Sequence, residues 1–98
     1  MNEKDLFTKE EDIFNDSLKV IVLDIENGSK VFDDVRIVKI KSKNYTVMIM
    51  LDYAPTIGDL DGDLSILLQS DEVFYKNVKG FYHINNNEMT ILLTSNKG

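Results

Sequence analysis

The pattern of apolar and polar positions changes near residue 18. Before it, residues 1–17 are acidic and lack valine, and Leu6, Phe7, Ile13 and Phe14 fall at a spacing that fits one side of a short helix. An isolated helix of this length is only marginally stable in water. We therefore expect a short N-terminal acidic leader over residues 1–17 that is either mobile or docked on the rest of the chain as a short helix.

After the leader, short β-favouring runs alternate with turn-forming residues, and no long helical stripe follows. The expected strands are Lys19–Ile25, Lys30–Phe32, Val35–Lys41, Tyr45–Met50, Asp63–Gln69, Val73–Val78 and Glu88–Thr94, and Phe81–Ile84 continues the strand Val73–Val78. Strands this short, joined by local turns, are typical of two packed sheets or one closed sheet. The pattern predicts an all-β domain over residues 18–98, either an antiparallel β-sandwich or a flattened barrel.

The stretch from Met48 to Gly62 contains the only proline of the chain. Because Pro55 cannot donate a hydrogen bond to a strand ladder, Tyr53–Pro55 is expected to be a connection. Asp61-Gly62 predicts a tight turn before the next strand. The strand before the connection is nearly all apolar, so we expect it to be buried on both faces or to lie in the middle of a sandwich layer, with its two methionines filling gaps in the core.

Two further turn signals follow in the second half of the chain. Gly80 interrupts a strand pattern, which usually marks a bulge or a kink. The run Asn85-Asn86-Asn87 consists of residues that tolerate the left-handed backbone region, and it predicts a turn.

Composition limits the classes of function. A chain of 98 residues builds one domain, and the absence of cysteine removes disulfides and thiolate metal ligands. The net charge of −6 and the dispersed basic residues disfavour nucleic acid as a partner. Lys39, Lys41 and Lys43 share one strand face, which is expected to be its solvated side. No secretory signal and no run of about 20 apolar residues occurs, so we expect a cytoplasmic chain without direct membrane insertion.

Candidate chemistry is sparse. His83 is the only histidine and has no nucleophile or further ligand near it in the sequence. Asp59, Asp61 and Asp63 alternate as in a calcium loop, but the glycine and the terminal glutamate of that motif are misplaced, which favours a solvated acidic turn. We expect no catalytic residue, no metal site and no cofactor. The alternative is a small enzyme or metal binder that uses His83 with nearby carboxylates.

Three segments nevertheless match one known pattern in order and spacing. They are Leu18-Lys19-Val20 with Gly28, Val31-Phe32 and Val35; the run from Met48 to Pro55 with Leu60 and Gly62; and Gly80-Phe81 with Ile84, Asn87 and Met89-Thr90-Ile91-Leu92. On these residues, the chain from Leu18 to Leu92 resembles the N-terminal β-sandwich domain of the epsilon subunit of F-type ATP synthase, called delta in mitochondria. The central run falls on the family's Gly-Ile-Leu-Pro-Gly-His-Ala-Pro.

The resemblance implies a flattened β-sandwich at the foot of the rotating central stalk. It implies a non-catalytic epsilon-like subunit that binds the gamma subunit, touches the c-ring, and is peripheral to the inner face of the membrane through the complex. The chain stops before the C-terminal helical hairpin of many members. Because connecting loops usually make the contacts that a sandwich positions, the expected protein-binding residues are Asp52, Tyr53, Pro55 and Ile57.

The chain also departs from the family pattern in two places. The family's Gly-Glu-Leu falls near Lys43–Val47, which contains no acid, and its Pro-Gly-His becomes Leu51-Asp52-Tyr53. In the family these loop residues face the c-ring. The alternative function is therefore a stand-alone β-sandwich adaptor that binds a protein but has lost the synthase contacts.

Overall fold

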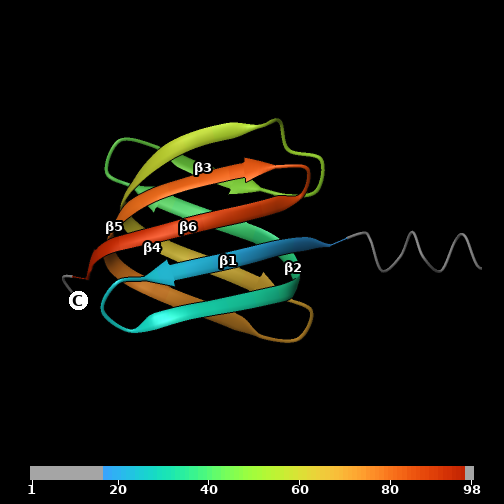
Figure 1. Cartoon of the computed structure of the whole chain (residues 1–98). Coiled ribbons are helices and arrows are strands. Elements are labelled where there is room, and N and C mark those ends of the chain that lie inside the picture. The colour runs from blue at the N-terminus through green and yellow to red at the C-terminus, as the bar shows by residue number, and fades with distance from the viewer. Residues whose placement is uncertain (1–16, 97–98) are drawn as a thin grey trace, which may run out of the picture.

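The computed structural model describes residues 17–96, and these form six strands without a helix (Figure 1). The strands are β1 (Leu18–Asp24), β2 (Gly28–Ser42), β3 (Thr46–Ile49), β4 (Thr56–Leu68), β5 (Glu72–Asn85) and β6 (Glu88–Asn96). The helix or mobile segment expected for the leader lies outside the described residues, apart from Ser17. None of the described residues belongs to a helix with the length and hydropathy that crossing a membrane requires.

The strands form one sheet in the order β1-β6-β5-β4-β2-β3, and an additional pairing of β1 with β2 closes it into a ring. This confirms the all-β prediction of a sandwich or flattened barrel. All neighbouring pairs are antiparallel except β1 and β6, which are parallel. The parallel pair was not predicted, because it joins strands from opposite ends of the sequence.

The three long strands β2, β4 and β5 each run through two layers. The sheet is therefore closed like a barrel, yet its two layers pack face to face like a sandwich. In β2, residues 28–35 pair with β1, whereas residues 35–42 pair with β4 and in part with β3. In β5, residues 72–78 pair only with β4, whereas residues 78–85 pair also with β6. The first layer is thus β3 with residues 35–42, 62–68 and 72–78. The second layer is β1 and β6 with residues 28–35, 56–62 and 78–85, and it faces the viewer in Figure 1.

The long strands change layer at irregularities in their pairing. The β2–β4 register shifts between Val35 and Ile37, and the β4–β5 register shifts between Gly62 and Leu64. Opposite the second shift, Asn77 has φ 55°, and its backbone N–H donates to Asp63 Oδ1 at 3.1 Å. These bulges bend the strands from one layer into the other.

The predicted turn at Asp61-Gly62 is therefore wrong, because both residues lie inside the continuous strand β4. A Cβ atom on Gly62 would lie 2.2 Å from the carbonyl oxygen of Lys41. The glycine permits close contact between β4 and β2 instead of reversing the chain. The expected acidic turn of Asp59, Asp61 and Asp63 is likewise part of the strand.

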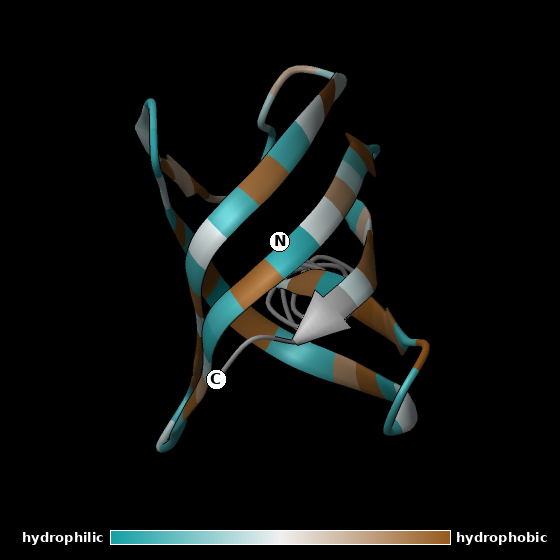
Figure 2. Cartoon of the chain, turned by 90° about the vertical axis from the view of Figure 1, so that its left-hand side faces the viewer, coloured by the Kyte–Doolittle hydropathy of each residue, from teal (hydrophilic) through white to brown (hydrophobic). Residues whose placement is uncertain are grey.

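The core lies between the two layers. Figure 2 shows hydrophobic and hydrophilic residues alternating along the strands, as expected when one face of each layer is covered. The largest fully buried side chains include Leu18, Ile40, Ile49, Leu60, Leu64, Ile66, Ile84, Met89, Ile91 and Leu93. The expectation for the strand Tyr45–Met50, burial on both faces or a place in the middle of a layer, was wrong, because β3 pairs with β2 alone at the end of the strand order. Ile49 is buried, but Met48 and Met50 are exposed, because β3 belongs to a layer with solvent on its outer side.

Several local predictions are confirmed, while the expected division of one strand was wrong. Asn86 and Asn87 have φ values of 53° and 62° and form the two-residue turn between β5 and β6. Gly80 lies at a register shift of the β5–β6 pair. The expected strand 73–78, continued by 81–84 beyond this kink, is confirmed as β5. The expected separate strands 30–32 and 35–41 instead form the single strand β2. A bulged strand resembles two strands in sequence because the bulge breaks its alternation.

Candidate protein-interaction surfaces

The four predicted binding residues lie on the connection between β3 and β4 and at the start of β4. Asp52 and Pro55 are exposed, and Tyr53 is half-buried against the core. Ile57 is the most exposed large apolar side chain among the described residues, at 78% of its surface. The structure therefore separates the four residues: Tyr53 supports the core, whereas Ile57 points away from it.

Asp52 fixes the connection to the turn between β5 and β6. Its backbone N–H donates to Asn87 Oδ1 at 2.7 Å, and Asn87 Nδ2 donates to Asp52 Oδ1 at 3.4 Å. The carbonyl oxygen of Asn87 also accepts a hydrogen bond from the Lys19 backbone N–H at 3.0 Å. Asn87 thus joins the connection, the turn and the start of β1 at one end of the second layer.

An apolar surface covers the outer side of the second layer, and Ile57 is part of it. We call it the apolar face; its exposed members are Leu23, Val31, Ile57, Phe81 and Leu92. Phe81 is the register partner of Leu92, which in turn is beside Leu23, so these three form one row across β5, β6 and β1. The neighbouring row runs from Ile57 through His83, Thr90 and Ile21 to Val31. The two rows make the apolar side chains contiguous.

The apolar face is hollowed between β4 and β6. A depression of about 310 Å³ is lined by Ile57, Phe81, Tyr82, His83, Thr90 and Leu92. Phe81 is 56% exposed, which is a large fraction for an aromatic side chain in a strand. Contiguous exposed apolar surface of this kind usually marks a site that binds a protein, a membrane or a ligand.

Two tyrosines support the edge of this face from within. Tyr45 Oη donates to the backbone carbonyl of Asp59 and lies 3.1 Å from Tyr82 Oη. Burial raises the pKa of Tyr45, and the hydrogen bond with Tyr82 raises it further. The phenol therefore stays neutral and can continue to donate to β4 where that strand has no β2 neighbour.

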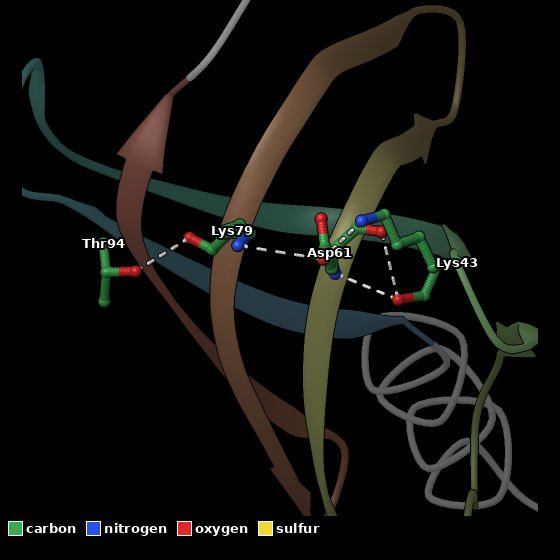
Figure 3. A network of polar contacts seen from close by, with 5 residues as sticks. Lys43, Asp61, Lys79 and Thr94 are labelled. Carbon is green, nitrogen blue, oxygen red and sulfur yellow. Dashed lines mark hydrogen bonds and ion pairs between the residues drawn. The ribbon is translucent and has the colours of Figure 1, made fainter.

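Asp61 links three strands at the side of the second layer (Figure 3). Its carboxylate lies 3.8 Å from Lys43 Nζ and 3.9 Å from Lys79 Nζ, and its backbone binds Ser42 and Lys43. Thr94 Oγ1 donates to the Lys79 carbonyl at 3.2 Å. The ion pairs are partly solvent-exposed, where such pairs contribute about 0–1 kcal/mol, so the backbone hydrogen bonds of Asp61 are the firmer part of this link between strands.

His83 lies exposed on the apolar face, between Ile57 and Thr90 in register. Within residues 17–96, no group of three or more His, Cys, Asp or Glu side chains is arranged so that it could hold a metal ion. Two carboxylates of the calcium-like sequence have other partners, Asp61 with lysines and Asp63 with the Asn77 backbone.

Sequence reasoning found Ile57 but not its neighbours on the apolar face. Phe81, Leu92 and Leu23 come from three strands whose pairing depends on the parallel β1–β6 contact. The sequence did contain one signal for these three residues. Each stands between inward-facing residues of its strand, and because successive side chains point to opposite faces, its own side chain points outward.

Comparison with known proteins supports the fold. No family model matches the sequence, and no curated protein sequence matches it. Among solved structures, the chain is similar to a chain in the cryo-EM structure of the Tetrahymena thermophila mitochondrial ATP synthase central stalk and c-ring. The TM-score is 0.66 at 15% sequence identity, and the match covers 81% of this chain and 64% of that chain.

Proposed function

We propose that this chain is a non-catalytic, epsilon-like component of the central stalk of an F-type ATP synthase. In this role it binds a gamma-type subunit through the apolar face, with the connection around Asp52, Tyr53 and Pro55 at its margin and the c-ring as a second partner. The observation that carries the proposal is the contiguous apolar face on a sheet whose fold is similar to that of a stalk and c-ring chain.

The composition of the apolar face suits a protein partner. Its centre is Phe81 beside Leu92 and Leu23, without a charged side chain in that row between β5 and β1. Charged groups begin at the margin, where Asp59 neighbours Phe81, and Lys19 neighbours Glu88 one row beyond His83. An apolar centre with a polar rim is the usual anatomy of a specific protein interface. Association through this face would place the chain on the cytoplasmic side, at the membrane only through its complex.

The experiment is a calorimetric titration with a purified gamma-type subunit encoded in the same genome. We expect Phe81→Glu/Leu92→Glu to weaken binding by at least about 2 kcal/mol, or about 30-fold, because it buries charge at the centre of the interface. Phe74→Glu/Leu67→Glu, on the outer side of the first layer, is the matched control and should bind like the parent. Failure of the parent to bind, or equal binding by the two variants, would refute the proposal.

The stand-alone adaptor is the second candidate, and one observation favours it. Both segments that depart from the family pattern make contacts within the chain: Tyr45 binds Asp59, and Asp52 binds Asn87. Residues engaged in this way present fewer groups to a c-ring. In the same titration, a stand-alone adaptor would not bind the gamma-type subunit. A gene distant from the synthase genes, in a genome that also encodes a separate full-length epsilon subunit, would favour the adaptor.

A further inference from the structure

The outer side of the first layer holds a second surface, which differs in chemistry from the apolar face. It is a shallow groove of about 210 Å³ lined by Lys39, Lys41, Asp63, Leu64, Ser65, Glu72, Phe74 and Lys76. We call it the lysine groove. Three strands contribute to it, because β2 pairs with β4 and β4 pairs with the first half of β5.

The three lysines of the groove are unpaired within residues 17–96, where the ion pairs join only Lys43 and Lys79 to Asp61. The groove also contains two carboxylates, each of which accepts one hydrogen bond, so three lysines against two acids leave it a net charge of +1. Glu72 Oε2 accepts a hydrogen bond from Ser65 Oγ at 2.5 Å, and Asp63 Oδ1 accepts one from the Asn77 backbone at 3.1 Å. The groove therefore presents amines that an acidic occupant would pair.

Apolar side chains lie in the same cross-strand row as one of these amines. Met48 is the register partner of Lys39, Lys39 of Ser65, and Ser65 of Phe74. Phe74 is 59% exposed and Met48 is 46% exposed. A fitting occupant thus combines carboxylates with aromatic or aliphatic side chains, because it must satisfy both kinds of group at once.

Residues 1–16 have this composition. Leu6, Phe7, Ile13 and Phe14 accompany six carboxylates and two lysines, so this segment bears a net charge of −4 out of −6 for the whole chain. The carboxylates are those of Glu3, Asp5, Glu10, Glu11, Asp12 and Asp16. Charge and apolar content are both complementary to the lysine groove.

The geometry of β1 brings the two together. Leu18 pairs with Val35 of the antiparallel strand β2. The line of β1, extended backwards beyond Leu18, therefore runs along β2 from Val35 towards Lys39. Lys39 lies four residues beyond Val35, roughly 13 Å along a strand. Sixteen residues can extend up to about 50 Å, and a tether of this length gives a local concentration on the order of millimolar.

We propose that residues 1–16 bind in the lysine groove of their own chain. Their carboxylates pair with Lys39, Lys41 and Lys76, and Phe7 or Phe14 packs on Phe74. This intramolecular contact is independent of the proposed stalk function, because it uses the opposite layer from the apolar face.

The test uses the full chain and its lack of cysteine, since Thr8→Cys provides a unique attachment point for a nitroxide spin label. Paramagnetic broadening of backbone amides is measured by NMR on isotope-labelled protein. We expect loss of the amide signals of Lys39, Ser65 and Phe74, and unchanged signals at Phe81 and Leu92. The signals should return in about 1 M NaCl, where the Debye length is about 3 Å.

Charge-reversal variants provide the controls. Lys39→Glu/Lys76→Glu should abolish the broadening at the groove, whereas Lys19→Glu/Lys30→Glu, the same charge change in strands of the second layer, should leave it intact. Glu10→Lys/Glu11→Lys should also abolish it without altering any described residue. Uniform broadening, broadening centred on Phe81, equal behaviour of the two lysine variants, or broadening only between labelled and unlabelled copies in a mixed sample would overturn the proposal.

Discussion

Gly58 lies directly against the ring of Tyr82. The two residues are register partners in β4 and β5, and a Cβ atom on Gly58 would lie 2.4 Å from Tyr82 Cζ and Oη. Tyr82 is only 5% exposed, so its ring has little room to move. The tyrosine that supports the apolar face from within thus depends on the absence of a side chain on the neighbouring strand.

Gly58→Ala should therefore lower the unfolding free energy by about 1–3 kcal/mol, the usual cost of overpacking, as measured by urea denaturation. The control is the same substitution with Tyr82→Leu, whose shorter side chain removes the contact. We expect the two changes to be non-additive, with a smaller cost of Gly58→Ala in the leucine background. Strict additivity would mean that the ring does not restrict this glycine.

Stability should fall at alkaline pH because of Tyr45. Burial raises the pKa of its phenol above the ordinary value of 10.0, so the folded state favours the neutral form. The stabilisation is complete below about pH 10 and is lost as the pH rises through the folded-state pKa. Tyr45→Phe should make the decline above about pH 10 shallower in denaturant titrations. Tyr75, whose pKa is also raised by burial, accounts for part of the remaining slope, and an unchanged slope in the Tyr45 variant would contradict the assignment.

Asn87 combines a left-handed backbone with a side-chain hydrogen bond, and two substitutions separate these roles. Asn87→Gly retains the permitted φ of 62° but removes the acceptor for the Asp52 N–H, whereas Asn87→Ala loses both. We expect the alanine variant to be less stable than the glycine variant by about 1 kcal/mol, the cost of a left-handed residue with a Cβ. Thermal unfolding measures the stability of the two variants. An alanine variant more stable than the glycine variant would show that backbone strain is not the main cause of the loss of stability.

Tyr53 and Ile57 should differ in what they lose on truncation. Tyr53→Ala should lower the unfolding free energy by about 2 kcal/mol or more, because this half-buried ring packs against the core. Ile57→Ala should stay within about 0.5 kcal/mol of the parent, since its side chain is 78% exposed.

Binding to a gamma-type subunit should show a different pattern for these two variants. Ile57→Ala should weaken association on the scale of an interface hot spot, about 2 kcal/mol, while the protein stays folded. An Ile57 variant that binds as tightly as the parent would remove this residue from the interface.

The sequence predicts the local turns and strands of this fold better than it predicts which strands pair with one another. The asparagine turn was predictable because asparagine tolerates the positive φ that Asn86 and Asn87 adopt. The kink at Gly80 was predictable because glycine inside a strand usually marks an irregularity. The prediction at Gly62 was wrong because glycine after aspartate usually indicates a turn. The actual reason for this glycine is its close contact with the backbone of Lys41, which the sequence does not reveal. Close approach between strands leaves no local trace that distinguishes it from a turn.

The candidate surfaces were less accessible from the sequence. Ile57 was singled out, but Phe81 and Leu92 became neighbours of Leu23 only through the parallel pairing. Lys39 and Lys41 were assigned to one strand face, whereas Lys76 and Phe74 joined them through the bulged β4–β5 pair. A surface assembled from distant strands requires the order of the sheet, which depends on non-local contacts.

The position of β6 between β1 and β5 has a consequence for protein synthesis on the ribosome. Until residues 88–96 have left the exit tunnel, β1 has only β2 as a neighbour, and the second half of β5 has only β4. The apolar side chains of the unfinished layer then remain open to water and to other nascent chains. Insertion of this one strand between its two neighbours completes the core and the interaction surface in the same event.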